Sequence, residues 1–256
     1  MKKTTAILTA AAAVMLTTPA MAHGYLGLNY GNTNLDAGEG EEADISNWQA
    51  DGAIGSGHGG WGWQADASAG NLEGEGGEGD ASFWTVTGHL YWGGDGWRVG
   101  GVAGLTDVEE IDDSEWMIGA EGAIDFTPNA EGFASATWGG LEEVDLWNID
   151  GGVNVFPSPN VRIGGTIGIG HIEGEGGEGE ADTFSAGING EIQPWSAPIS
   201  IVGGWNLFNI DDADIDSNTF TIGARWNFGG GSVQERHNFT GIDTYTGYLN
   251  RFYGIY

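Results

Sequence analysis

Apolar and polar residues alternate one by one in segments that recur along most of the chain, and the segment 83–92 shows the pattern clearly. One face of it carries the apolar or small residues Trp84, Val86, Gly88, Leu90 and Trp92. The other face carries Thr85, Thr87, His89 and Tyr91. Because successive side chains of a β-strand point to opposite sides, this alternation predicts a strand with one apolar face and one polar face.

The same pattern occurs six times, and each occurrence opens with an aromatic residue after an acidic stretch. These six opening residues are Trp48, Trp84, Trp116, Trp147, Phe184 and Phe220. Six partner segments lie between them, at residues 25–30, 61–70, 97–106, 131–140, 161–170 and 199–208. Segment 131–140 consists largely of small residues, so the sequence does not fix its register. The chain is therefore expected to contain twelve strands.

The connections between these segments alternate between two kinds. The acidic and longer ones are residues 36–44, 73–80, 107–115, 141–145, 173–182 and 211–216. The short, turn-like ones are residues 56–60, 93–96, 127–130, 157–160 and 194–198. This alternation predicts an all-β fold, a transmembrane antiparallel up-and-down β-barrel of twelve strands, because a closed barrel satisfies every backbone polar group inside lipid. A soluble β-sandwich is the alternative, but it does not explain aromatic residues at both ends of the strands.

The ends of the chain differ from the alternating region. Residues 1–22 resemble a secretory signal, with Lys2 and Lys3 before an apolar core and a small-residue motif, Ala20-Met21-Ala22, at its end. We expect cleavage before His23 and a barrel over residues 23–228. Residues 229–256 follow three glycines, and we interpret them as a periplasmic C-terminal tail. In an alternative reading, the final aromatic residue closes the last strand, which would change the strand count.

On this signal, on the repeated strands that end in Trp226-Asn227-Phe228, and on the alternating loop lengths, the chain resembles small bacterial outer-membrane β-barrels of the porin-like type. The resemblance covers residues 23–228 as architecture and rests on no specific motif. It implies a location in the bacterial outer membrane, contact with outer-membrane lipid and passive diffusion of small hydrophilic solutes. It also implies that the long connections face outward and the short turns face the periplasm. The six opening aromatic residues would then lie at the outer membrane interface.

The charge of the chain narrows its function further. Residues 23–256 contain all 37 acidic residues, 5 arginines and no lysine or cysteine, which gives a formal charge of −32. This charge argues against nucleic acid as a partner, and the absence of cysteine excludes disulfides. The acidic loops predict an anionic vestibule that includes Glu75, Glu78, Asp80, Glu175, Glu178 and Glu180. The alternation places further polar residues on the lumen face: Asp51, His89, Glu121, Asp125, Asp150, Glu191 and Arg225. Cation preference follows as a hypothesis, while a merely solvated acidic surface stays open as the alternative.

Cofactors and catalysis receive little support. The loop carboxylates allow weak association of Ca²⁺ or Mg²⁺, but their spacing matches no dedicated site, so no metal site or cofactor is expected. His58, His89 and His171 have no orienting triad partner in view, so we do not expect an enzyme.

Small lumen residues such as Gly62, Gly100 and Gly223 leave room for water and favour a narrow pore. The rival function is a structural or surface-interaction barrel without significant transport. The solute and the oligomeric state do not follow from the sequence.

Overall fold

The computed structural model describes residues 22–38, 42–58, 60–74, 81–109, 114–141, 144–174, 179–194, 197–211 and 215–240. These residues form twelve strands and one short helix. The strands are β1 (His23–Asp36), β2 (Glu42–His58), β3 (Trp61–Gly74), β4 (Ala81–Gly94), β5 (Trp97–Val108), β6 (Glu115–Thr127), β7 (Ala130–Leu141), β8 (Val144–Ser158), β9 (Val161–Gly174), β10 (Glu180–Ile192), β11 (Ile199–Ile210) and β12 (Ile215–Phe228). The helix is α2 (Val233–Thr240).

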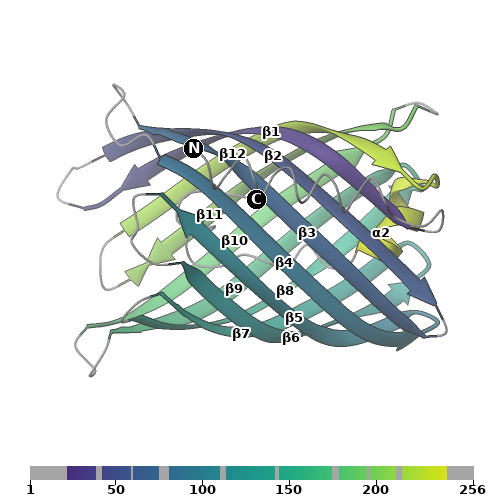
Figure 1. The fold of residues 1–256 in the computed structure, drawn as a ribbon, viewed down its shortest axis with the longest axis horizontal. Helices are drawn as coiled ribbons and strands as arrows, with labels where there is room; N and C mark the ends of the chain where they lie inside the picture. The colour runs from purple at the N-terminus through teal and green to yellow at the C-terminus, as the bar shows by residue number, and fades with distance from the viewer. Residues whose placement is uncertain are drawn as a thin grey trace.

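Every strand pairs antiparallel with its neighbours in the sequence, and β1 pairs with β12 to close the barrel. Figure 1 shows the strands running obliquely around a single hollow layer, with α2 at one end. The predicted twelve-stranded up-and-down barrel is confirmed. We call the end with the short connections, such as residues 95–96 and 159–160, the turn end, and the opposite end the loop end.

The strands are longer than the alternation predicted, and the acidic connections are correspondingly shorter. For example, Asp36 at the end of β1 pairs with Glu42 at the start of β2, so only residues 37–41 connect them. Acidic side chains do not end a strand while its backbone N–H and C=O groups still find partners on both sides. The structure also fixes the register of β7, in which Ser135 pairs with Glu121 on β6 and with Asp150 on β8.

The middle of the barrel exposes its apolar face outward. Seven large apolar side chains on this face are between 49% and 61% exposed: Leu90, Val99, Ile118, Ile149, Ile167, Ile188 and Ile222. Aromatic pairs lie near both edges of this band: Trp92 packs edge-on against Trp97 and Trp116 against Trp138, each with ring centroids 4.9 Å apart. An apolar band bordered by aromatic residues is the surface that a membrane-spanning barrel presents to lipid.

At the loop end the distribution of polarity is reversed. The outward positions there are acidic, and they include Asp44, Glu73, Asp145, Glu173, Asp182 and Asp216. Many inward positions there are apolar and at most 4% exposed, among them Leu72, Phe83, Val108, Met117, Leu146, Phe208 and Ile210, although Thr33, Glu115, Ser217 and Thr219 are also buried. A polar exterior around an apolar interior is the arrangement of a barrel in water. The strands therefore continue past the lipid-facing band, with acidic side chains on the outside and many apolar side chains on the inside.

After Phe228 the chain turns back toward the barrel. Gly229, Gly230 and Gly231 have φ values of 84°, 76° and 88°, a region that residues with a Cβ rarely adopt. Helix α2 then begins with a capping box, in which Glu235 N–H donates to Ser232 Oγ at 3.2 Å and Ser232 N–H donates to Glu235 Oε2 at 2.8 Å. In the part of the chain that the structure describes, no helix has the length and apolar character needed to cross a membrane.

Candidate functional site

The candidate site is a polar cavity of about 220 Å³ inside the barrel. Its wall consists mainly of amide, hydroxyl and carboxylate side chains, among them Asn29, Asn47, Gln49, Asp51, Gln64, Asp66, Ser68, Thr85, Thr87, Asp150, Thr166, Asn189, Asn206 and Thr221. These residues come from nine of the twelve strands, β1 to β4 and β8 to β12, because one side chain in two along each strand points inward. The cavity is large enough to hold several water molecules.

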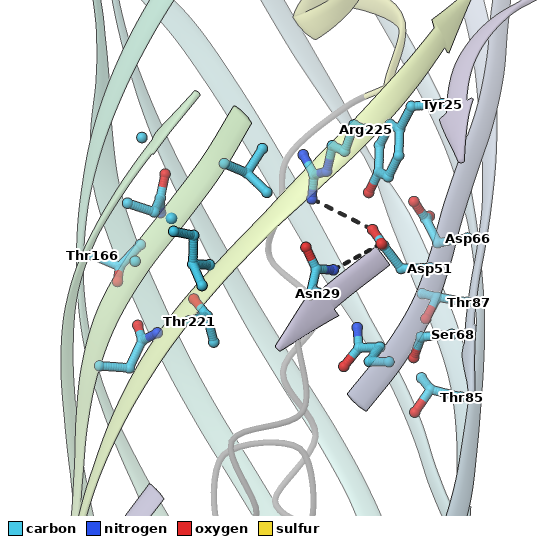
Figure 2. A pocket seen from close by; sticks show the side chains of 18 of the residues that line it. Tyr25, Asn29, Asp51, Asp66, Ser68, Thr85, Thr87, Thr166, Thr221 and Arg225 are labelled. Atoms are coloured by element: carbon cyan, nitrogen blue, oxygen red, sulfur yellow. Dashed lines mark hydrogen bonds and ion pairs between the residues drawn. The ribbon is translucent and has the colours of Figure 1, made fainter. Parts of the chain in front are cut away.

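Arg225 on β12 is the centre of one charged group on the cavity wall (Figure 2). Its guanidinium nitrogens lie 3.6 Å from Asp51 Oδ2 and 3.6 Å from Glu191 Oε2, and its carbon atom lies 4.0 Å from the centre of the Tyr25 ring. Asn29 donates a hydrogen bond of 2.8 Å to Asp51 Oδ1. The positive charge is therefore shared between two acidic residues on opposite sides of β12, and the Tyr25 ring adds a cation–π contact.

His89 on β4 is the centre of a second group. Its Nδ1 lies 2.9 Å from Glu121 Oε1, and its Nε2 lies 3.1 Å from Asp66 Oδ2. Both ring nitrogens thus face carboxylate oxygens, which accept hydrogen bonds and do not donate them. This geometry differs from a catalytic triad, in which one ring nitrogen faces a nucleophile.

Helix α2 contributes two basic residues to the turn end of the lumen. His237 Nε2 lies 2.8 Å from Glu131 Oε1, and Arg98 Nη2 lies 2.8 Å from the other oxygen of the same carboxylate. Arg236 Nη1 donates to Gln193 Oε1 at 3.0 Å, and its Nη2 lies 3.4 Å from Glu191 Oε1. Burial lowers the pKa of Arg236, and the carboxylate of Glu191 opposes that shift.

The loop end of the lumen is narrowed by apolar side chains. Leu72, Ala81, Phe83 and Val108 form a buried cluster, and Ile45 and Leu141 pack against it. We call these six residues the apolar cluster. Its members come from strands β2 to β5 and from β7, so the cluster extends over part of the circumference rather than a single strand pair. The polar cavity thus lies between an apolar region at the loop end and a charged region at the turn end.

The predicted lumen residues occupy different depths. The residues Asp51, His89, Asp150 and Arg225 line the cavity. Glu121 contacts the side chain of His89. Glu191 lies at the turn end beside α2, and Asp125 is exposed near the end of β6. Whether these side chains line an open pore stays a prediction.

The predicted vestibule is only partly within the described residues. Glu180 is exposed at the start of β10. Glu75, Glu78, Asp80, Glu175 and Glu178 lie outside the described residues. Among the described residues, no group of three or more histidine and acidic side chains is arranged to hold a metal ion. Weak Ca²⁺ or Mg²⁺ association with the loops stays a prediction.

The six predicted interface aromatic residues all lie on the lipid-facing side of their strands. Trp48, Trp147 and Phe220 are exposed, whereas Trp84, Trp116 and Phe184 are half-buried. Trp48 packs against Tyr30 with ring centroids 5.1 Å apart, and Trp147 stacks on His171 at 6.1 Å. Their placement at a lipid–water interface stays a prediction.

The lumen glycines make room for neighbouring side chains as well as for water. The Tyr91 side chain lies over Gly62 on β3 and against Gly100 on β5, where a Cβ on either glycine would collide with it. Asn29 lies over Gly223 in the same way. The free volume is therefore smaller than the number of glycines predicts. Long side chains that lie flat against a glycine-rich wall fill part of the space that each glycine leaves.

The alternation of apolar and polar residues does not predict that α2 lies in the lumen. One signal was present: Ser232-Val233-Gln234-Glu235 matches the capping-box pattern that starts a helix. The return of this helix into the barrel depends on tertiary contacts that no local pattern encodes.

Comparison with known proteins places this architecture among bacterial outer-membrane barrels. No protein-family model and no curated protein matches the sequence. The COG4313 outer-membrane channel from Pseudomonas putida F1 is similar in structure, with a TM-score of 0.60 and 9% identity over 81% of this chain and 95% of that one. The translocator domain of the autotransporter NalP from Neisseria meningitidis has a TM-score of 0.56 and 10% identity over 89% and 95%. The NanC porin has a TM-score of 0.52 and 9% identity over 78% and 98%.

At these identities the likeness concerns the fold. Together with the closed twelve-stranded meander and its apolar outer band, it defines the chain as a porin-like β-barrel of the bacterial outer-membrane type. The fold alone is shared by channels, porins and a translocator domain, so transport and selectivity belong to the proposal below.

Proposed function

We propose that the protein is a porin-like outer-membrane channel for passive diffusion of small hydrophilic solutes, with cations preferred over anions. The observation that carries the proposal is the polar cavity inside a barrel whose outer face is apolar. In the outer membrane, the turn end would face the periplasm and the loop end would face the outside of the cell. Hydroxyl and amide groups along the wall replace part of a solute's hydration shell without binding it tightly.

The charges on the wall support cation preference. Asp51, Asp66 and Asp150 line the cavity. Among the residues that the structure describes, its basic lining residues are Arg162, Arg225 and His89. Arg225 is within 3.6 Å of two carboxylates, which offset its charge. The exposed acids at the loop end add a negative potential that concentrates cations before they enter. The expectation that the chain is not an enzyme is part of the same proposal.

Two experiments test the channel and its selectivity separately. Liposome swelling with neutral sugars and small charged solutes tests diffusion, and swelling no faster than that of empty liposomes would exclude a channel. Reversal potentials in planar bilayers under a salt gradient test selectivity. A potential of the sign for anion preference would leave the channel intact and overturn the cation preference.

A second function is favoured by a specific observation, the filling of both ends of the lumen. The apolar cluster occupies part of the loop end, and Arg236 and His237 of α2 are buried at the turn end. A barrel closed in this way serves as a structural or surface-interaction protein with its acidic loop end as the working face. Such a protein would fold into bilayers without measurable single-channel conductance.

A further inference from the structure

Helix α2 extends across the turn end of the barrel rather than along its outside (Figure 1). It lies close to β1, β2 and β3 on one side of the ring. On the other side, Arg236 reaches Glu191 on β10 and His237 reaches Glu131 on β7. Arg236 Nη2 also lies 3.5 Å from the hydroxyl of Ser200, a fully buried residue on β11. One helix thus contacts opposite walls of the same opening.

The backbone of the helix is also anchored to the short turns. Gln234 N–H donates to the carbonyl oxygen of Pro159 at 3.0 Å, and the Gln234 side chain contacts the carbonyl oxygen of Pro128. These acceptors belong to the turns that connect β8 with β9 and β6 with β7. A small polar pocket remains between α2 and the wall, lined by Tyr25, Arg162, Glu191, Arg225 and Asn227 together with Val233, Arg236 and His237.

The contacts that hold α2 are of a kind that water can replace. The helix reads Val-Gln-Glu-Arg-His-Asn-Phe-Thr, and Val233 is its one residue that is both apolar and buried among those whose side chains the structure describes. A helix without an apolar stripe gains little from burial and depends on polar contacts. Each such contact contributes little net stability, because hydrogen bonds to water take its place on release. The three glycines before Ser232 connect the helix to β12 by a segment with no secondary structure.

We propose that α2 is a removable plug that closes the turn end of the barrel when docked and opens it when released. The plug closes the same lumen that the proposed function uses for diffusion, so its effect on current rests on that function. Docking and release of α2 do not depend on that function, because they change the accessibility of buried residues whether or not the barrel conducts.

Accessibility of Ser200 measures docking directly. The chain has no cysteine, so Ser200→Cys places a single thiol beneath α2, and its reaction with a water-soluble maleimide reports whether the helix covers it. Adding Arg236→Glu puts a carboxylate beside Glu191 and should raise the labelling rate about tenfold or more, as expected for loss of a charge-assisted hydrogen bond. Asn238→Glu is the matched control, because it adds a carboxylate to an exposed position of the same helix and should leave the rate unchanged.

Current is measured in a second set of full-length variants that can be locked. Pro159→Cys with Gln234→Cys places two thiols at residues joined by a backbone hydrogen bond, close enough for a disulfide. In this background Arg236→Glu should raise conductance about tenfold under reducing conditions, and oxidation should return it to the level of the unmodified protein. The single-cysteine variants show whether the redox reagents alone change the current.

The outcomes separate the two proposals. Labelling of Ser200→Cys that is equally fast with and without Arg236→Glu would overturn the plug. Current that is present but does not respond to release or to the disulfide would also overturn it, because the path would then bypass α2. Release seen by labelling, with no current from any variant, would support a docked and removable helix and overturn the channel function instead.

Discussion

His237 Nε2 lies 2.8 Å from Glu131 Oε1, although 106 positions separate the two residues in the sequence. Glu131 also accepts a hydrogen bond of 2.8 Å from Arg98 Nη2. One carboxylate on β7 therefore joins a basic residue of the barrel wall to a basic residue of α2. The Glu131 side chain is only 5% exposed. If Glu131 were neutral, each basic partner would therefore lose a nearly desolvated counter-charge.

Glu131→Gln should weaken both the turn end of the barrel and the docking of α2. The substitution keeps the shape of the side chain and removes its charge, and loss of one member of a buried charged group costs on the order of 3 kcal/mol. The measurement is the urea concentration at the midpoint of unfolding in detergent micelles. Glu42→Gln, at an exposed position of β2, is the control. Equal midpoints for the two variants would show that the Glu131 carboxylate contributes no stability.

Gly230→Ala should loosen α2 through backbone strain alone. A Cβ at this position meets no atom within 4 Å, but the φ value of 76° disfavours any residue with a side chain, at a cost of about 1 kcal/mol. Labelling of Ser200→Cys in this background should be about fivefold faster. Gly88→Ala is the control, because its Cβ also meets open space and no positive φ is involved. A response of the same size to both substitutions would exclude strain as the cause.

The sequence predicted the barrel wall well, because period-two alternation is imposed by the strand itself. Trp84 and Leu90 face outward and Thr85 and His89 inward, as the pattern requires. Prediction from the sequence failed for features that depend on non-local contacts. The acidic ends of the strands were assigned to loops, since the pairing of Asp36 with Asp216, 180 positions away, exists only in the closed sheet. The docking of Arg236 depends on Glu191, 45 positions away.

Asp150→Asn should lower the preference for cations. Asp150 lines the cavity, and removal of one carboxylate from a narrow passage of low dielectric reduces the local attraction for cations. We expect the permeability ratio of K⁺ to Cl⁻ to fall about twofold or more, measured as a smaller reversal potential under a salt gradient. Asp216→Asn removes the same charge from an exposed outward position at the loop end. A larger effect from Asp216 than from Asp150 would place selectivity at the surface instead of in the lumen.

Phe83→Ala should open the loop end at the expense of stability. The Phe83 ring is fully buried in the apolar cluster, and truncation of such a ring costs about 3–5 kcal/mol. Because apolar constrictions block ions by excluding water, the enlarged space should also raise single-channel conductance. Ile118→Ala, on the lipid-facing side of β6, removes apolar volume without touching the lumen. If both variants conduct like the unmodified protein, the cluster does not limit the current.

Acid should release α2 through Glu235. Hydrogen bonds from Ser232 hold the pKa of Glu235 below its ordinary value, because they favour the charged carboxylate. A folded-state pKa below the unfolded value contributes stability above the ordinary carboxyl pKa, and this stability is lost as the pH falls through the lowered pKa. A nitroxide on Asn238→Cys, at an exposed position of α2, should therefore gain mobility on acidification, measured by electron paramagnetic resonance. Glu235→Gln should be more mobile at neutral pH and show a smaller acid response, because it lacks the carboxylate that accepts the hydrogen bond from Ser232. An acid response of unchanged size in the Glu235→Gln variant would mean that the capping box does not govern docking.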